Sequence, residues 1–273
     1  ARSSPTSSGN GPASATEACP RDGAVAGVPT PSWHDEEMDS DVTEAAQHLR
    51  AQWDRLDRWL RDLGDELDRD AGRESVLDGW TVGELVTHLG RVMETLALCG
   101  PVPAGTVPLT LAEYLGTYPE RAEEIEHATR ALDEQIADDR LGHVEAFAAA
   151  GFARLDELAD ESVVQARRGP ITLLDMVRSR VLELVVHADD LARTFPGVPA
   201  DPVDRAALDA VAAELLHVVV TRGGWALEVH DARLWLRVAC GRVPYDVDEL
   251  ARALEPVHTS EAVPDLGRML PLL

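Results

Sequence analysis

The chain has 273 residues, of which 49 are acidic and 25 basic, so its formal net charge is −24. All the basic residues are arginine, which excludes chemistries that need a lysine amine, such as Schiff-base formation and a complete P-loop. The acidity argues against nucleic acid and anionic membranes as partners, because phosphate binding needs clustered positive charge.

Residues 1–34 differ in composition from the rest of the chain. They contain six Ser, five Pro and four Gly, and their few charges cancel. Such a segment cannot bury enough apolar surface to offset the entropy lost on ordering. We therefore predict a disordered tail over residues 1–34, so that the remaining residues carry the whole net charge.

Four blocks of helical periodicity follow, in which apolar residues recur at three- and four-residue steps along one helix face. They cover residues 39–67, 81–99, 109–158 and 172–194, the third broken near Pro119 and 138–142. Thr81 and Glu84 form a capping box at the start of the second block. The connections are short, and one is a loop that ends at Gly169-Pro170. The pattern predicts a mostly α fold, with an antiparallel four-helix bundle over residues 35–195.

Residues 196–273 predict a small α/β domain. The pattern indicates a helix at 203–219, a strand at 225–230 and a short helix at 248–254. The segment 231–241 alternates like a strand, yet Asp231 and Gly241 would cap a helix equally well. We favour a helix there.

The three cysteines, Cys19, Cys99 and Cys240, are far apart and odd in number. They form neither a disulfide framework nor a metal-binding pair, and they suit a reducing compartment. No stretch approaches the roughly 18 uninterrupted apolar residues of a membrane span. We therefore expect a cytoplasmic protein with no membrane partner.

Glu183 and His187 stand four residues apart, on one face of an otherwise apolar helix. A carboxylate buried there is costly unless it is neutralised, paired or bound to a metal. His88 edges the apolar face of the second helix and can meet this pair across the core. Two imidazoles and one carboxylate suit Zn²⁺, and also Fe²⁺, Ni²⁺ or Co²⁺, with positions left open for water or substrate. The alternatives are a satisfied polar pair and a hydrogen-bonded core histidine.

Two motifs then carry a family resemblance. Residues 79–89 (GWTVGELVTHL) and the pattern R-x-x-E-x-x-x-H-x-x-D-L at 180–191 resemble the second-helix and last-helix signatures of one family. It is the DinB-like, mycothiol-dependent maleylpyruvate isomerase family. The resemblance spans roughly residues 39–195 and implies that His88, Glu183 and His187 bind a metal ion. Residues 231–242 and 270–273 are similar to the sterol-carrier-like domain that follows the bundle in actinobacterial members.

The resemblance implies a mycothiol-dependent metalloenzyme, either an isomerase or a thiol S-transferase that acts on a small molecule. A metal-bound thiolate would be the nucleophile, since metal coordination lowers the pKa of a thiol. Arg180, one turn before Glu183, and Asp190, three residues after His187, are candidates to orient the metal ligands. The alternative is a non-catalytic carrier or regulatory protein that binds a metal or a small apolar ligand.

Overall fold

The structure is a computed structural model that describes residues 33–258 and 262–273. The predicted tail lies outside the described residues, apart from Trp33 and His34, which begin the first helix. That helix, α1 (Trp33–Leu63), thus starts ahead of the periodic pattern at Asp39. Within the described residues, no helix is long and apolar enough to cross a membrane.

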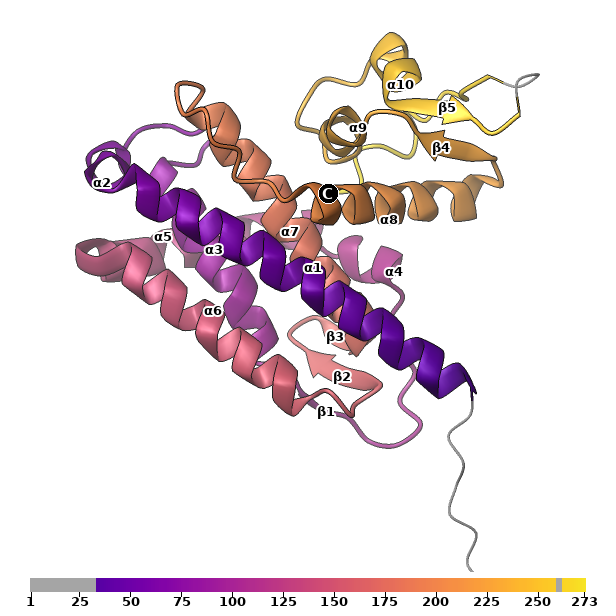
Figure 1. The fold of residues 1–273 in the computed structure, drawn as a ribbon, viewed down its shortest axis with the longest axis horizontal. Coiled ribbons are helices and arrows are strands. Elements are labelled where there is room, and N and C mark those ends of the chain that lie inside the picture. Colours follow the sequence, from indigo (N-terminus) through magenta and orange to yellow (C-terminus); the bar gives the residue numbers. More distant parts are fainter. Residues whose placement is uncertain (1–32, 259–261) are drawn as a thin grey trace, which may run out of the picture.

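Four long helices form the predicted bundle (Figure 1). They are α1, α3 (Val82–Ala97), α6 (Arg140–Glu157) and α7 (Leu173–Thr194). Helix α3 packs along α6 and against α7, and α1 packs against α7. Beside α3 lies α5 (Ala122–Ile136), and the connections contain α2 (Asp65–Asp70), α4 (Leu111–Leu115) and two 3-10 turns, Pro119–Arg121 and Ala137–Asp139. The mostly helical fold class and the predicted breaks in the third block are confirmed.

The first predicted helix is interrupted before its expected end. Helix α1 ends at Leu63, because Gly64 has a φ of +51°, which an α-helix does not allow. The chain then continues as α2, and both Leu63 and Leu67 are buried. The prediction of one helix through Leu67 is therefore wrong. The sequence pattern does not reveal the break because the apolar spacing continues across it.

Two glycines let α3 and α6 approach closely. A Cβ atom at Gly90 of α3 would lie 3.0 Å from a side-chain atom of α6, and one at Gly151 of α6 would lie 2.7 Å from the backbone oxygen of Met93. A larger residue at either position would force the helices apart. At the start of α3, the side chains of Thr81 and Glu84 form the predicted capping box. These contacts fix the position of α3.

The segment before α7 is a β-hairpin, so the prediction of a loop there is wrong. Strand β2 (Val163–Ala166) pairs antiparallel with β3 (Gly169–Thr172), and β1 (Gly100–Pro101) pairs with the other edge of β2. A Gly-Pro dipeptide is typical of turns. Here, however, the carbonyl of Pro170 accepts a hydrogen bond from the backbone of Leu109 at 2.8 Å, and the turn is Arg167-Arg168. The strands are too short for a period-2 signal, and β1 and Leu109 are distant in sequence.

In the C-terminal region, the described residues form three helices and a two-stranded antiparallel sheet. In chain order, these are α8 (Arg205–Gly223), β4 (Leu227–Val229), α9 (Ala232–Ala239), α10 (Val247–Ala253) and β5 (Leu254–Pro256). The helix favoured at 231–241 is confirmed, and the Asp231 side chain caps it by accepting a hydrogen bond from the backbone of Leu234. The small α/β fold is confirmed, whereas its sterol-carrier-like nature stays a prediction.

The C-terminal region packs onto the bundle through α8 and through ion pairs with α7 (Figure 1). The buried apolar side chains of both parts form one continuous cluster. Asp189 of α7 is buried and accepts hydrogen bonds from Arg237 at 2.7 and 2.8 Å and from Arg233 at 3.3 Å. The final segment returns to the end of α9, where the backbone of Leu272 donates to the carbonyl of Ala239.

Candidate metal centre

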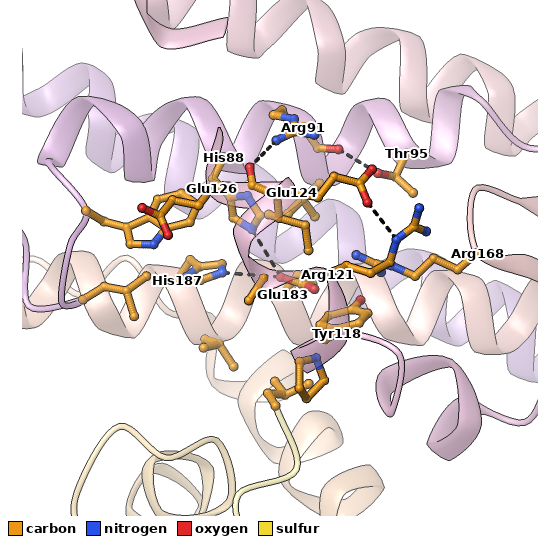
Figure 2. A pocket seen from close by; sticks show the side chains of 18 of the residues that line it. His88, Arg91, Thr95, Tyr118, Arg121, Glu124, Glu126, Arg168, Glu183 and His187 are labelled. Carbon is orange, nitrogen blue, oxygen red and sulfur yellow. Dashed lines mark hydrogen bonds and ion pairs between the residues drawn. The ribbon is translucent and has the colours of Figure 1, made fainter. Parts of the chain in front are cut away.

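The structure brings His88, Glu183 and His187 together at the contact between α3 and α7 (Figure 2). The Nε2 atom of His88 lies 3.5 Å from Oε2 of Glu183, and Nε2 of His187 lies 3.4 Å from the same oxygen. One donor atom from each residue lies within 4.8 Å of the other two. The two imidazole rings are nearly perpendicular, with centroids 4.8 Å apart.

The two contacts that Glu183 makes with the histidines have the spacing of ligands on a small divalent ion. A charge-assisted hydrogen bond spans about 2.7–2.9 Å, so both contacts to Glu183 are long for direct hydrogen bonds. Ligand atoms about 2.0–2.1 Å from a tetrahedral ion are separated by about 3.4 Å, which matches the two contacts. The side chains are nearly buried, with exposed fractions of 13% for His88, 10% for Glu183 and 7% for His187. The donor set therefore fits Zn²⁺ and related transition metals.

The charge states of the three residues also suit metal binding. Burial lowers the pKa of His88 to about 4, which keeps this imidazole neutral and able to ligate. Burial disfavours the charged form of Glu183, but its contacts with His187 and His88 and the charge of Arg180 hold its pKa well below the usual range. Burial also disfavours a charged His187, yet contacts with Asp190 and Glu183 raise its pKa overall. An ion that binds here takes the place of the His187 proton.

Asp190 orients His187, as the sequence spacing suggests. Its Oδ2 atom lies 3.1 Å from Nδ1 of His187, which leaves Nε2 of the ring facing Glu183. Asp190 is fully buried and also accepts hydrogen bonds from Arg242, at 3.1 and 3.2 Å. A carboxylate behind a histidine in this way fixes the tautomer and orientation of the ring. Sequence reasoning missed Arg242, because nothing near it in sequence indicates a contact with α7.

Arg180, the other candidate to orient the metal ligands, contacts Tyr118 and the backbone of α3. Its guanidinium is buried and donates to the hydroxyl of Tyr118 at 2.9 Å and to the carbonyl of Val92 at 3.3 Å. In the described structure it does not hydrogen-bond to Glu183, and it acts on that carboxylate through its charge. Burial raises the pKa of Tyr118, so the phenol stays neutral. Arg180 therefore fixes Tyr118 beside the candidate metal centre.

Trp80 packs against His88, the candidate ligand from α3. The Trp80 and His88 rings meet edge to face, with centroids 5.2 Å apart. In the described part of the chain, Nδ1 of His88 is buried without a hydrogen-bond partner. The His88 ring is therefore positioned by packing, whereas a carboxylate positions the His187 ring.

The three candidate ligands line a cavity of about 530 Å³, a volume typical of small-molecule sites. Its other walls come from α5, from the turn between β2 and β3, and from Pro271 and Leu273 of the C-terminal region. Six arginines contribute to the lining: Arg91, Arg121, Arg167, Arg168, Arg180 and Arg242. An open cavity beside a candidate ion site can admit both a thiol and a small anionic molecule.

The fold and the site define a helical bundle with a candidate His₂Glu metal centre beside a small-molecule cavity. The family described as "mycothiol maleylpyruvate isomerase N-terminal domain" matches residues 49–192, more than half of the chain. The chain belongs to this family, which confirms the resemblance. The matched region contains the three candidate ligands as well as Arg180 and Asp190.

Among solved structures, the chain is similar to the crystal structure of the mycothiol-dependent maleylpyruvate isomerase. The two are 20% identical, with a TM-score of 0.41, and the alignment covers 68% of this chain and 72% of that one. No curated protein matches the chain.

Proposed function

We propose that this protein is a mycothiol-dependent metalloenzyme that isomerises a small molecule or transfers the thiol to it. The observation that carries the proposal is the convergence of His88, Glu183 and His187 on one side of the 530 Å³ cavity, in a chain of this family. Both reactions would use the thiol as a nucleophile toward an electrophilic carbon, and an ion held by these three residues would activate it.

The proposed ligands are these three residues, with Zn²⁺ as the favoured ion and Fe²⁺, Ni²⁺ or Co²⁺ as alternatives. The chemistry that such an ion supplies when bound is a lowered thiol pKa, so that the sulfur is held as a thiolate at neutral pH. The protein supplies two imidazole nitrogens and one carboxylate oxygen, which leaves coordination positions for other ligands. Catalytic metal sites share this incomplete protein shell.

The surrounding residues hold the donor atoms and shape the cavity. Asp190 accepts a hydrogen bond from Nδ1–H of His187, so that the unprotonated Nε2 is available as a metal ligand. Trp80 restrains His88. Val92, Val186 and Leu273 line the cavity with apolar surface, which excludes water and strengthens every electrostatic contact inside. These residues prepare a small, partly dry site for a charged nucleophile.

Metal analysis of the purified full-length chain tests the first part of this proposal. We expect close to one transition-metal ion per chain, and a loss of that ion in His88→Ala and in Glu183→Gln. His143→Ala is the matched control, since His143 is a helical histidine outside the cavity. Metal that is absent from the wild type, or that survives in both ligand variants, would overturn the assignment.

Spectroscopy and kinetics test the second part. Mycothiol added to the Co²⁺-loaded protein should produce a sulfur-to-cobalt absorption band that His187→Ala removes. Turnover of maleylpyruvate, or of a common electrophile, should then require mycothiol. Turnover of the first substrate indicates an isomerase, and turnover of the second indicates a transferase. A stoichiometric metal with neither a thiol band nor thiol-dependent turnover would favour the non-catalytic binding protein.

A further inference from the structure

Four of the arginines that line the cavity make no ion pair. Within the described residues, Arg91, Arg167, Arg168 and Arg180 have no carboxylate oxygen within 4.0 Å. Acidic residues outnumber basic ones by 49 to 25 in this chain, so a carboxylate partner is easily supplied at most places. Arg180 is occupied by its hydrogen bonds to Tyr118 and Val92, which leaves three arginines unexplained.

Arg168 is held with donor groups free. Its guanidinium carbon lies 3.9 Å from the centroid of the Tyr118 ring and 5.4 Å from that of Tyr114. Stacking of this kind orients the guanidinium plane without using its N–H groups. In the described part of the chain, its Nη1 atom is buried and lacks a hydrogen-bond partner. A buried donor without a partner is costly, and a ligand acceptor in the cavity removes that cost.

Arg91 and Arg167 add charge beside Arg168. Only Nη1 of Arg91 bonds to the protein, at 2.8 Å to the carbonyl of Ile125 and at 2.6 Å to the hydroxyl of Thr129, as far as the described residues show. Burial lowers the pKa of Arg91, and so do the positive charges of Arg167 and Arg168, while Glu94 and Glu124 partly offset this repulsion. An anion bound between them relieves this repulsion.

Among the described residues, the acidic side chains on the same wall form no ion pair with these three arginines. Glu124 pairs with Arg121 at 3.0 Å, and Glu126 pairs with Arg130 at 2.6 Å. Both carboxylates line the cavity but are bound by other guanidinium groups. Arg242 is likewise bound to Asp190. The unpaired positive charge of the cavity thus belongs to Arg91, Arg167 and Arg168.

We propose that Arg91, Arg167 and Arg168 form a subsite for an anionic oxyacid group, a carboxylate or a phosphate, of the molecule that enters the cavity. Guanidinium groups bind both oxyacids through paired N–H donors. Arg168 lies on the side of the pocket away from His187 (Figure 2). The subsite therefore holds the charged end of the ligand while its other end reaches the candidate metal centre. The identification of this ligand as the substrate rests on the proposed function.

Titration calorimetry on the metal-depleted full-length protein tests the subsite without the ion. Fumarate and inorganic phosphate serve as separate probes of the two oxyacids. We expect one or both to bind the wild type and to bind about 10–100-fold more weakly to Arg168→Gln and Arg91→Gln, because each variant removes a charge-assisted contact. Arg58→Gln is the matched control, since Arg58 is exposed, unpaired in the described structure and outside the cavity. Circular dichroism shows whether each variant folds.

The outcomes separate this proposal from the proposed function. Anion binding that survives in Glu183→Gln but fails in folded Arg168→Gln supports the subsite, even if the protein proves to hold no metal. The probe that binds more tightly identifies the oxyacid. The subsite is refuted if neither probe binds the wild type, if Arg58→Gln weakens binding as much as Arg168→Gln, or if Glu183→Gln alone abolishes binding.

Discussion

Two consecutive carboxylates on α7 allow a sharp test of how the candidate metal centre is organised. Asp189 and Asp190 are both buried, and both accept hydrogen bonds from arginines of the C-terminal region. Only Asp190 also contacts a histidine, at 3.1 Å from Nδ1 of His187. We predict that Asp190→Asn weakens metal binding and that Asp189→Asn does not.

The expected size follows from these contacts. Loss of the carboxylate behind a metal-binding histidine typically lowers metal affinity by about 10–100-fold. Each substitution also removes the carboxylate charge from an ion pair with arginine, and we expect each to lower the free energy of unfolding by about 1–3 kcal/mol. A fully buried pair would lose more, but the partner arginines, Arg237 and Arg242, are 28% and 18% exposed. The two variants should thus resemble each other in stability and differ in metal affinity.

Competition with a coloured chelator measures the metal dissociation constant, and urea unfolding of the metal-free proteins measures stability. The wild type and both variants are compared in the same buffer and at the same pH. Equal metal affinity in Asp189→Asn and Asp190→Asn would refute the reasoning, because the effect would then come from a weakened contact between the bundle and the C-terminal region. An Asp190→Asn protein with wild-type affinity would refute it as well.

Three further predictions concern the surroundings of the site. Gly151→Ala should lower the free energy of unfolding by about 1–3 kcal/mol, because the added Cβ would lie 2.7 Å from a backbone oxygen. Gly72→Ala is the control, since a Cβ there has no atom within 4 Å and should change stability little. Equal melting temperatures of the two variants would contradict this prediction. The pKa of His187 is raised, so its contribution to stability is fully present below its unfolded value of 6.5 and is lost as pH rises through the folded value. Melting of the metal-free protein should show that loss, and metal-loaded protein should not, since the ion replaces the proton. Trp80→Ala should weaken metal binding, because the His88 ring loses the packing that positions it, and Trp80→Phe should restore the affinity. Chelator competition measures both affinities, and wild-type affinity in Trp80→Ala would contradict the prediction.

The local features of the fold are readable from the sequence because they depend on near neighbours. The capping box at Thr81 and Glu84 and the cap at Asp231 each involve residues three apart, and both are present. The positions of Glu183 and His187 on one helix face follow from helical geometry alone. That His88 meets them required the family resemblance, since spacing fixes a face but not the neighbouring helix.

What the sequence does not reveal depends on long-range contacts. Arg242 reaches Asp190 from beyond the matched region, and its side chain looks like any surface arginine in the sequence. The hairpin at 163–172 is short and contains a proline, so its local sequence is typical of a turn. Its strands form because β2 pairs with β3 and with the distant Gly100. Because Arg168 lies at the tip of this hairpin, the unpaired arginines could not be placed beside the candidate ligands without the structure.

The net charge of −24 describes the surface and does not identify the ligand. Charges in solvent are screened within about 8 Å at physiological salt, so acidic side chains elsewhere on the molecule act weakly inside the cavity. Arg91 and Arg168 are half-buried, where a charge contact is stronger than in water, whereas Arg167 is exposed. A long polyanion would have to cross the acidic surface to reach these groups, whereas a small anion can enter the cavity alone. The same chain can therefore repel nucleic acid and select a small oxyacid.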